Sequence, residues 1–233
     1  MFFGKIKSTM YIIKANRAYA SGDVQGTIDH LEKAYKTGSA KSSVVTTYGY
    51  VLLKYGRLEE AMKIFDEQLR SPKLTNSELY DTQSNYALGL WKQGKLDEAI
   101  KLFEEIIPKY KNTSIYGSLG YLYNLAGDLE KALKFNLEAA DYNSTGGVIS
   151  DNLGQTYYLM GEYEKANEVF KKLMTLNPKF PEAYYDYALV LEKLGDKEKC
   201  IEMLKNSQLY KLNYLSAISK EDIENKLAEM EAQ

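Results

Sequence analysis

Small and large apolar side chains recur along this chain at a fixed interval. Six short segments align on a glycine, and five residues after each glycine comes a small side chain. Nine residues after the glycine comes a large apolar side chain in five of the six segments, and only Asn136 departs. The glycines are Gly22, Gly56, Gly94, Gly127, Gly161 and Gly195. Their successive spacings of 34, 38, 33, 34 and 34 residues indicate a repeated structural unit.

The residues around each glycine predict a pair of helices. Apolar residues lie four and eight positions before most of the glycines, as with Leu52 and Tyr48, and such an i, i+4 pair forms one stripe of a helix. The residue seven positions before the glycine is always small, so two helix backbones can approach closely there. Glycine favours the end of one helix, and the acidic residues that follow favour the start of the next. Each unit is therefore predicted to be a helical hairpin.

We expect these hairpins and a closing helix to form a single domain over residues 1–233. The 38-residue interval carries about four extra residues, which we place in a loop at 71–76. The N-terminal segment is predicted to be the first helix, because Lys14 and Arg17 interrupt the apolar run that a signal peptide needs. Residues 219–231 predict an N-capped closing helix. The hairpins are predicted at about 6–40, 42–74, 76–111, 113–145, 147–179 and 181–212.

This arrangement resembles the tetratricopeptide repeat, a helix-turn-helix motif of 34 residues. The fifth segment carries the motif best, with Leu153-Gly154, Tyr157, Gly161, Tyr163, Ala166, Phe170 and Pro178. The resemblance covers roughly residues 6–212. It implies an all-α fold, a right-handed superhelix (solenoid) of six hairpins with a C-terminal capping helix. It also implies a protein-binding scaffold that is not an enzyme.

Composition narrows the possible partners. Thirty Lys plus Arg balance thirty-two Asp plus Glu, and a net charge of −2 argues against nucleic acid as the partner. No run of about 18 apolar residues occurs, so we expect no membrane insertion. A single cysteine excludes an internal disulfide and fits a reducing, cytoplasmic location. One histidine excludes most zinc sites, and we expect no metal and no cofactor.

The reactive side chains predict no catalytic site. His30 lies beside Asp29 and Glu32 and could act as a general base, but no nucleophile recurs near it. We therefore expect a surface histidine on a charged face. Cys200 occupies the small-residue position that alanine fills in other repeats, so we expect a buried structural thiol. The carboxylates of the second helices have lysines three or four residues away, which predicts solvated ion pairs.

A second stripe of each first helix is left to contact a partner. It consists of the residues 13, 10, 9 and 6 positions before each glycine, here called the groove stripe, which in tetratricopeptide proteins lines the concave groove. None of its 24 residues is Lys or Arg, so the family's cationic clamp for carboxylates is not expected. Candidate contacts come from this stripe and from Trp91, three residues before Gly94. They are Asn16, Tyr50, Asp81, Asn85, Trp91, Tyr121, Asp151, Asn152, Gln155, Tyr185 and Asp186.

The chemistry of the groove stripe indicates the kind of ligand. An asparagine amide can donate to and accept from a peptide backbone, and tyrosine adds contact area at low entropic cost. Asp81, Asp151, Glu182 and Asp186 bias the charge of the far half of the groove, so we predict binding of a neutral-to-basic peptide segment or partner protein. Two alternatives stay open: a peptide-sensing regulator or assembly factor, and a homo-oligomer joined through tyrosine-rich surfaces.

Overall fold

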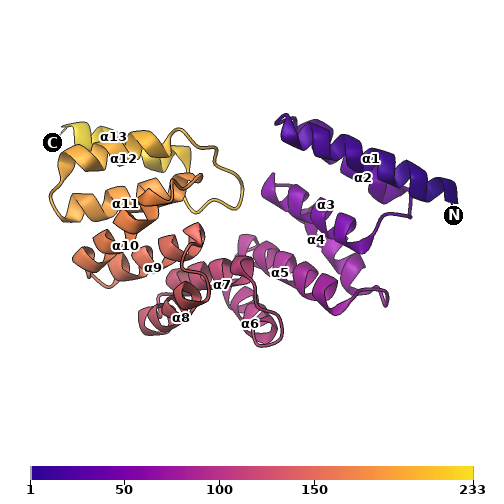
Figure 1. Ribbon diagram of the computed structural model, residues 1–233, viewed down its shortest axis with the longest axis horizontal. Helices are drawn as coiled ribbons and strands as arrows, with labels where there is room; N and C mark the ends of the chain where they lie inside the picture. Colours follow the sequence, from indigo (N-terminus) through magenta and orange to yellow (C-terminus); the bar gives the residue numbers. More distant parts are fainter. Residues whose placement is uncertain (1, 233) are drawn as a thin grey trace. The chain divides into compact units, whose positions relative to one another are not determined.

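The chain is all-helical in its computed structural model, which describes residues 2–232 (Figure 1). Those residues form 13 α-helices and no strand. They fall into two compact units, Met1–Ile106 and Ile107–Gln233. Each unit has its own set of hairpins, called here the N-terminal unit and the C-terminal unit.

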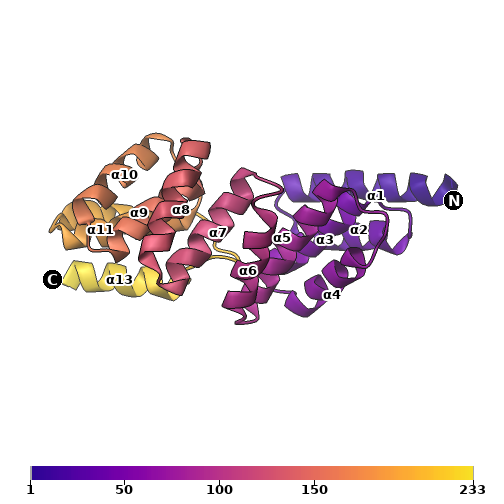
Figure 2. The same ribbon diagram turned by 90° about the horizontal axis from the view of Figure 1, so that it is seen from below.

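The N-terminal unit consists of three antiparallel hairpins. α1 packs on α2, α3 on α4 and α5 on α6, and neighbouring hairpins meet through α2 with α3 and α4 with α5 (Figure 2). This pairing confirms the helical hairpins predicted for the first three repeats. The helices are α1 (Phe2–Ala20), α2 (Val24–Lys36), α3 (Ser42–Lys54), α4 (Leu58–Leu69), α5 (Asn76–Lys92) and α6 (Leu96–Ile106).

The C-terminal unit contains three more hairpins and a closing helix. Its helices are α7 (Thr113–Ala126), α8 (Leu129–Tyr142), α9 (Gly147–Leu159), α10 (Tyr163–Thr175), α11 (Pro181–Lys193), α12 (Lys197–Ser207) and α13 (Lys220–Ala232). The first helices pack in succession, α7 on α9 and α9 on α11. Helix α13 packs on α12 and buries Ile223 and Met230. Ser219 Oγ accepts from the backbone N–H of Asp222 at 3.1 Å, which confirms the predicted N-cap.

All six repeat glycines lie at the bends between paired helices. Their φ angles are between 75° and 81°, a left-handed conformation that side chains with a Cβ rarely adopt. At Gly161, for example, the backbone N–H donates to the carbonyl of Tyr158 as α9 ends, and α10 begins two residues later. The glycine frame read from the sequence therefore marks the turns of the fold.

The small and large positions of the repeat meet inside each hairpin. A Cβ added to Gly154 would lie 2.5 Å from a ring carbon of Phe170, and one added to Gly49 would lie 2.5 Å from Phe65. Both rings are fully buried. The residue seven positions before the glycine thus packs against the residue nine positions after it, which explains why one is small and the other large.

The four extra residues of the third repeat lie in a helix and not in the predicted loop. Helix α5 has 17 residues, whereas α3, α9 and α11 have 13 each. The connection before α5 keeps the ordinary length, since α5 begins 20 residues after Gly56 and α3 begins 20 residues after Gly22. Thr75 and Glu78 form a capping box that starts α5 early. The insertion therefore adds about one helical turn.

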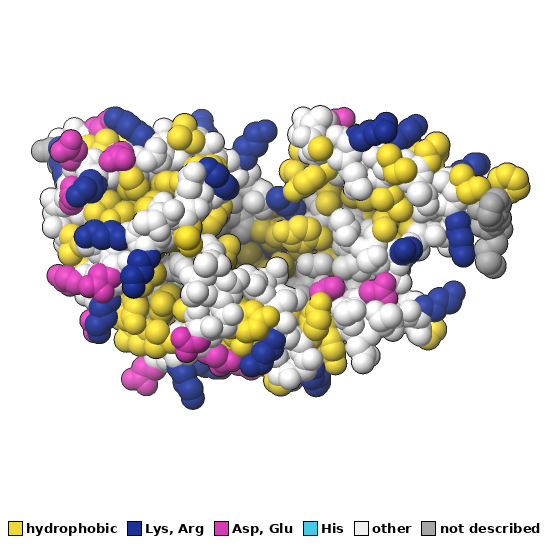
Figure 3. Space-filling view, viewed as in Figure 1, with side chains coloured by type: hydrophobic (Ala, Val, Ile, Leu, Met, Phe, Trp, Pro, Cys, Tyr) yellow, Lys and Arg dark blue, Asp and Glu magenta, His cyan; other side chains and the backbone are white. Residues whose placement is uncertain are grey.

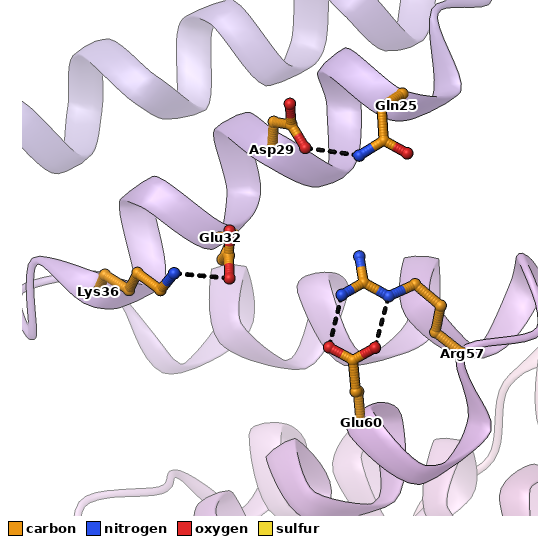
Figure 4. Close-up of polar contacts among 6 residues, drawn as sticks. All are labelled: Gln25, Asp29, Glu32, Lys36, Arg57 and Glu60. Carbon is orange, nitrogen blue, oxygen red and sulfur yellow. Dashed lines mark hydrogen bonds and ion pairs between the residues drawn. The ribbon is translucent and has the colours of Figure 1, made fainter.

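The outer surface of the second helices carries the predicted ion pairs. In the N-terminal unit Lys36 pairs with Glu32 and Arg57 with Glu60, and the neutral amide of Gln25 donates a hydrogen bond to Asp29 (Figure 4). These side chains are largely solvated, so each pair contributes about 0.3–0.5 kcal/mol at most. Their role is to keep this face polar.

The structure confirms the prediction for Cys200 but not the prediction for His30. Cys200 is fully buried, as predicted, and burial raises the pKa of its thiol to about 11. His30 is not the surface residue that we expected. It is half-buried, its ring stacks on Tyr11 with centroids 6.5 Å apart, and its Nδ1 is buried without a hydrogen-bond partner among the described residues. It therefore belongs to the packing between α1 and α2.

Helix α1 presents apolar side chains to solvent on the face away from α2. Phe3, Ile6, Met10 and Ile13 are 43–79% exposed and follow a helical spacing of three and four residues. Apolar side chains are visible over this helix among lysines and arginines (Figure 3). The solvated side of this hairpin is therefore both apolar and basic.

Candidate functional site

The structure gathers groove-stripe residues into two pockets, one within each unit. The N-terminal pocket has a volume of about 300 Å³ and lies among α1, α2 and α3. Asn16 and Tyr50, both predicted contacts, line it together with Tyr19, Thr47, Lys54 and Tyr55. Asn16 and Tyr50 each lie six residues before a repeat glycine, so the repeat frame places them at one site.

The C-terminal pocket has a volume of about 240 Å³ and lies over α7, α9 and α11. Four predicted contacts line it: Tyr121, Gln155, Tyr185 and Asp186. Tyr158 adds a third ring, and Leu125, Leu159, Leu189, Ala217 and Ile218 make much of the wall apolar. Tyr121, Gln155 and Leu189 occupy the position six residues before their glycines, as Asn16 and Tyr50 do in the other unit.

Asp186 is the charged group of the C-terminal pocket. It is only 8% exposed, and it accepts a hydrogen bond from Gln155 Nε2 at a long 3.4 Å. Burial, and after it the charge of Glu182, raise the pKa of Asp186 to about 7. The carboxylate is therefore held in a setting that disfavours its ionised form.

Asp151, on α9, is a second buried carboxyl group near Asp186. It is 6% exposed, and its Oδ1 has no hydrogen-bond partner among the described residues. Burial raises its pKa well above the usual range, followed by the charges of Asp186 and Glu182. The same three carboxylates, after burial, raise the pKa of Tyr121. Asp151 and Asp186 therefore share one negative region with that tyrosine.

A buried polar network orients Gln155 toward Asp186. Asn124 Nδ2 donates to Gln155 Oε1 at 3.0 Å, which leaves the Gln155 amide N–H to face Asp186. Thr156 Oγ1 donates to Asn124 Oδ1 at 2.7 Å, and Asn136 Nδ2 donates to Thr156 Oγ1 at 2.9 Å. Asn136 is fully buried, so its departure from the large apolar pattern has a structural reason: it anchors this network.

Asn152 is not available to a peptide in this structure, contrary to our expectation. It is 2% exposed, and its Nδ2 donates to the carbonyl of Gly117 at 2.7 Å. Its own carbonyl accepts from Asn124 at 2.9 Å. Because α7 and α9 pack closely at Gly117, the amide joins the two helices and does not reach solvent. Asn152 is therefore part of the scaffold.

The predicted contacts on α5 lie outside both pockets. Asp81 is exposed, whereas Asn85 and Trp91 are half-buried. The Nζ of Lys92 lies 4.4 Å from the ring centroid of Trp91, a cation–π contact. These three residues line another part of the groove stripe and its border.

Sequence reasoning missed several residues of the C-terminal pocket. Tyr158 lies three residues before Gly161, the same repeat position as Trp91, so the repeat frame itself could have indicated it. Ala217 and Ile218 come from the segment between α12 and α13, where no repeat position applies. Only the folded structure could bring them to the pocket.

The described residues 2–232 contain neither a candidate metal site nor a candidate membrane-spanning helix. In this part of the chain, no group of three or more His, Cys, Asp or Glu side chains is placed to hold a metal ion. No helix there is both long and apolar enough to cross a bilayer.

Three family models match segments of this chain that contain the predicted repeats. Models described as tetratricopeptide or TPR repeats match residues 87–146, 154–195 and 181–213. The chain belongs to the tetratricopeptide repeat family. A TPR repeat-containing protein of Methanocaldococcus jannaschii, MJ1428, is 27% identical over 197 residues, which cover 84% of this chain and 30% of that protein. This tetratricopeptide protein thus spans less than a third of that relative.

Solved structures of other tetratricopeptide proteins share the fold. TTC0263, a thermophilic TPR protein of Thermus thermophilus, superposes with a TM-score of 0.66 at 19% identity, over 83% of this chain and all of that one. PilF of Pseudomonas aeruginosa gives 0.65 at 14% identity, over 89% and 93%. These likenesses confirm the predicted all-α solenoid class. The repeats themselves support a protein-interaction scaffold in general terms.

Proposed function

We propose that this tetratricopeptide protein is a non-enzymatic scaffold that binds a neutral-to-basic peptide segment of a partner protein on its groove stripe. The observation that carries the proposal is the lining of the C-terminal pocket. Asp186 lies there beside three tyrosines, and none of the described residues that line this pocket is Lys or Arg. Such a lining favours positive or uncharged ligand groups and disfavours acidic ones.

The remaining chemistry supports recognition of a peptide. The N-terminal pocket offers the amide of Asn16, the hydroxyl of Thr47 and the rings of Tyr19 and Tyr50. Amide and hydroxyl groups satisfy a peptide backbone, while tyrosine rings contribute area and a polar end. Both pockets use the same repeat position, so each unit offers the corresponding part of its repeats to a peptide.

An array of short peptides graded from acidic to basic tests this proposal. The labelled full-length chain is expected to bind neutral and basic peptides and to leave acidic ones. Tyr50→Ala combined with Tyr121→Ala should weaken binding about tenfold or more, as loss of aromatic anchors does elsewhere. Leu137→Ala, an exposed residue of α8 outside both pockets, is the matched control. Equal binding of acidic peptides, or full binding by the double variant, would overturn the assignment.

A further inference from the structure

We propose that the C-terminal pocket is a subsite for one arginine side chain of the bound peptide, with Asp186 as its counter-ion and the tyrosine rings as its walls. This inference rests on the proposed function and specifies the residue that the peptide must carry. It concerns Asp186, Tyr121, Tyr158 and Tyr185, which all line one pocket.

Asp186 is buried, and none of the described residues that line its pocket is a cation. A carboxylate that is only 8% exposed is costly unless a cation or several hydrogen bonds compensate it. The hydrogen bond from Gln155 is long, at 3.4 Å, and it comes from a neutral amide. Asp186 therefore gains when a cation enters the pocket that it lines.

The charged residues around the pocket in the C-terminal unit do not supply a cation for Asp186. Glu182 and Asp151 add negative charge, and after burial both contribute to the raised pKa of Tyr121. On α13, Asp222 is bonded to Ser219, and Lys226 lies 2.7 Å from Glu229 and 3.3 Å from Glu192. Lys226 is thus already shared between two carboxylates.

Asp151 is a second buried carboxylate close enough to Asp186 for the two charges to interact. Its Oδ1 is buried without a hydrogen-bond partner among the described residues, a rare state for a carboxylate in a folded protein. Asp151 lies one helical turn before Gln155, which lines the pocket, so the two share one face of α9. Asp151 is not among the residues that line the pocket, so its buried carboxylate adds to the negative charge around Asp186 and does not itself contact the ligand.

Arginine suits this pocket better than lysine or a metal ion. A guanidinium is planar, carries five donors and is more weakly hydrated than an ammonium, so it loses less on entering a largely apolar pocket. Its face can stack on Tyr121, Tyr158 or Tyr185 while its edge meets Asp186. A metal ion would instead require several oxygen ligands, whereas Asp186 is the only carboxylate among the described residues that line the pocket.

Titration of the full-length chain with capped amino acids tests the subsite. The probes are N-acetylarginine methylamide, the citrulline analogue, which has the same shape without the charge, and the lysine analogue. Binding is followed by NMR shifts and calorimetry. We expect arginine to bind about tenfold or more tightly than citrulline, and more tightly than lysine. In Asp186→Asn the preference over citrulline should fall to about twofold or less.

Matched variants separate loss of the site from loss of the fold. Asp81→Asn removes an exposed groove-stripe carboxylate outside this pocket, so it should keep the full preference for arginine. Tyr185→Leu should weaken arginine binding and keep its dependence on Asp186. Circular dichroism of Asp186→Asn should match the unmodified chain, since the amide has the shape of the carboxylate.

The outcomes distinguish this inference from the proposed function. If peptides bind but arginine and citrulline versions bind equally, or if Asp186→Asn keeps the arginine preference, the subsite is refuted and the peptide scaffold stands. If no peptide binds while capped arginine binds through Asp186, the scaffold proposal fails and a peptide is refuted as the source of the arginine, while the arginine specificity of the pocket stands. If neither peptides nor capped arginine bind, both are refuted.

Discussion

The two pockets share a position in the repeat and differ in charge. Asn16 and Tyr50 in the N-terminal pocket lie at the same repeat position as Tyr121 and Gln155 in the C-terminal pocket. The N-terminal pocket includes Lys54 and, among the described residues that line it, no carboxylate. The comparison teaches that the repeat frame determines where a pocket forms, while the side chains at variable positions determine what it can bind.

The largest expected effect on stability comes from the phenylalanine–glycine contact that hairpins of both units share. Phe65→Ala in one unit and Phe170→Ala in the other each remove a fully buried ring that packs on a glycine. Each should lower the free energy of unfolding of its unit by about 3–5 kcal/mol. Urea denaturation followed by circular dichroism measures this. Leu137→Ala, at a 43% exposed position, should cost about 1 kcal/mol or less. A loss of that small size at Phe170 would contradict the equivalence of the two units.

The next largest effect is a pH dependence of stability that comes from Asp186 in the C-terminal pocket. The pKa of Asp186 is about 7 in the folded chain, raised from 3.8. With respect to this group, the folded chain is most stable below about pH 4, where the carboxyl is protonated. That stability is lost as the pH rises through 7. Asp186→Asn should therefore stabilise the chain at pH 8 by on the order of 3 kcal/mol. At pH 4 the difference should disappear. Melting curves across this range measure it.

The control for this pH effect is Asp81→Asn, which changes an exposed carboxylate in the other unit. Its melting temperature should follow that of the unmodified chain at every pH. If the melting temperature of Asp186→Asn also followed that of the unmodified chain at every pH, burial would not disfavour the ionised form of Asp186.

A smaller effect concerns one buried repeat position that is polar in the C-terminal unit and apolar in the N-terminal unit. Asn124 and Leu53 occupy the same position, three residues before a glycine, and both are buried. Asn124→Leu would remove the hydrogen bonds that Asn124 makes with Thr156 Oγ1 and Gln155 Oε1, at a cost of about 1–3 kcal/mol. Urea denaturation tests this, together with Asn124→Asp, which keeps the acceptor for Thr156. A neutral Asn124→Leu would show that the network is dispensable.

The smallest expected effect concerns the helix caps, one in each unit. Thr75 begins the lengthened α5, and Ser219 begins α13. Alanine at either position should cost about 1 kcal/mol, since a backbone N–H in the first turn of the helix loses its partner. Thermal melts of Thr75→Ala and Ser219→Ala measure this, with serine at position 75 as the conservative control. A change of zero at Thr75 would contradict its role in extending α5.

The turns and the core could be predicted from the sequence because both follow the repeat. The glycines marked the bends, and the positions of Ala166 and Phe170 marked the buried contacts of a hairpin. The extra turn of α5 was misplaced because a loop containing Pro72 is the ordinary location for an insertion. The capping box of Thr75 and Glu78 was the local signal that pointed to a longer helix.

The site was only partly predictable, for physical reasons. Tyr121, Gln155, Tyr185 and Asp186 were placed together by position alone. The burial of Asn152 could not be predicted, because it depends on how closely α7 approaches α9 at Gly117. The role of Asn136 was equally hidden, since its partners Thr156 and Gly120 come from two other helices.

A crystal structure of the full-length chain with bound N-acetylarginine methylamide tests the central claim most directly. We predict the guanidinium in the C-terminal pocket, with its nitrogens about 2.7–2.9 Å from the carboxylate of Asp186 and its plane against a tyrosine ring. Density for the ligand elsewhere on the chain, with the pocket containing only water, would contradict it.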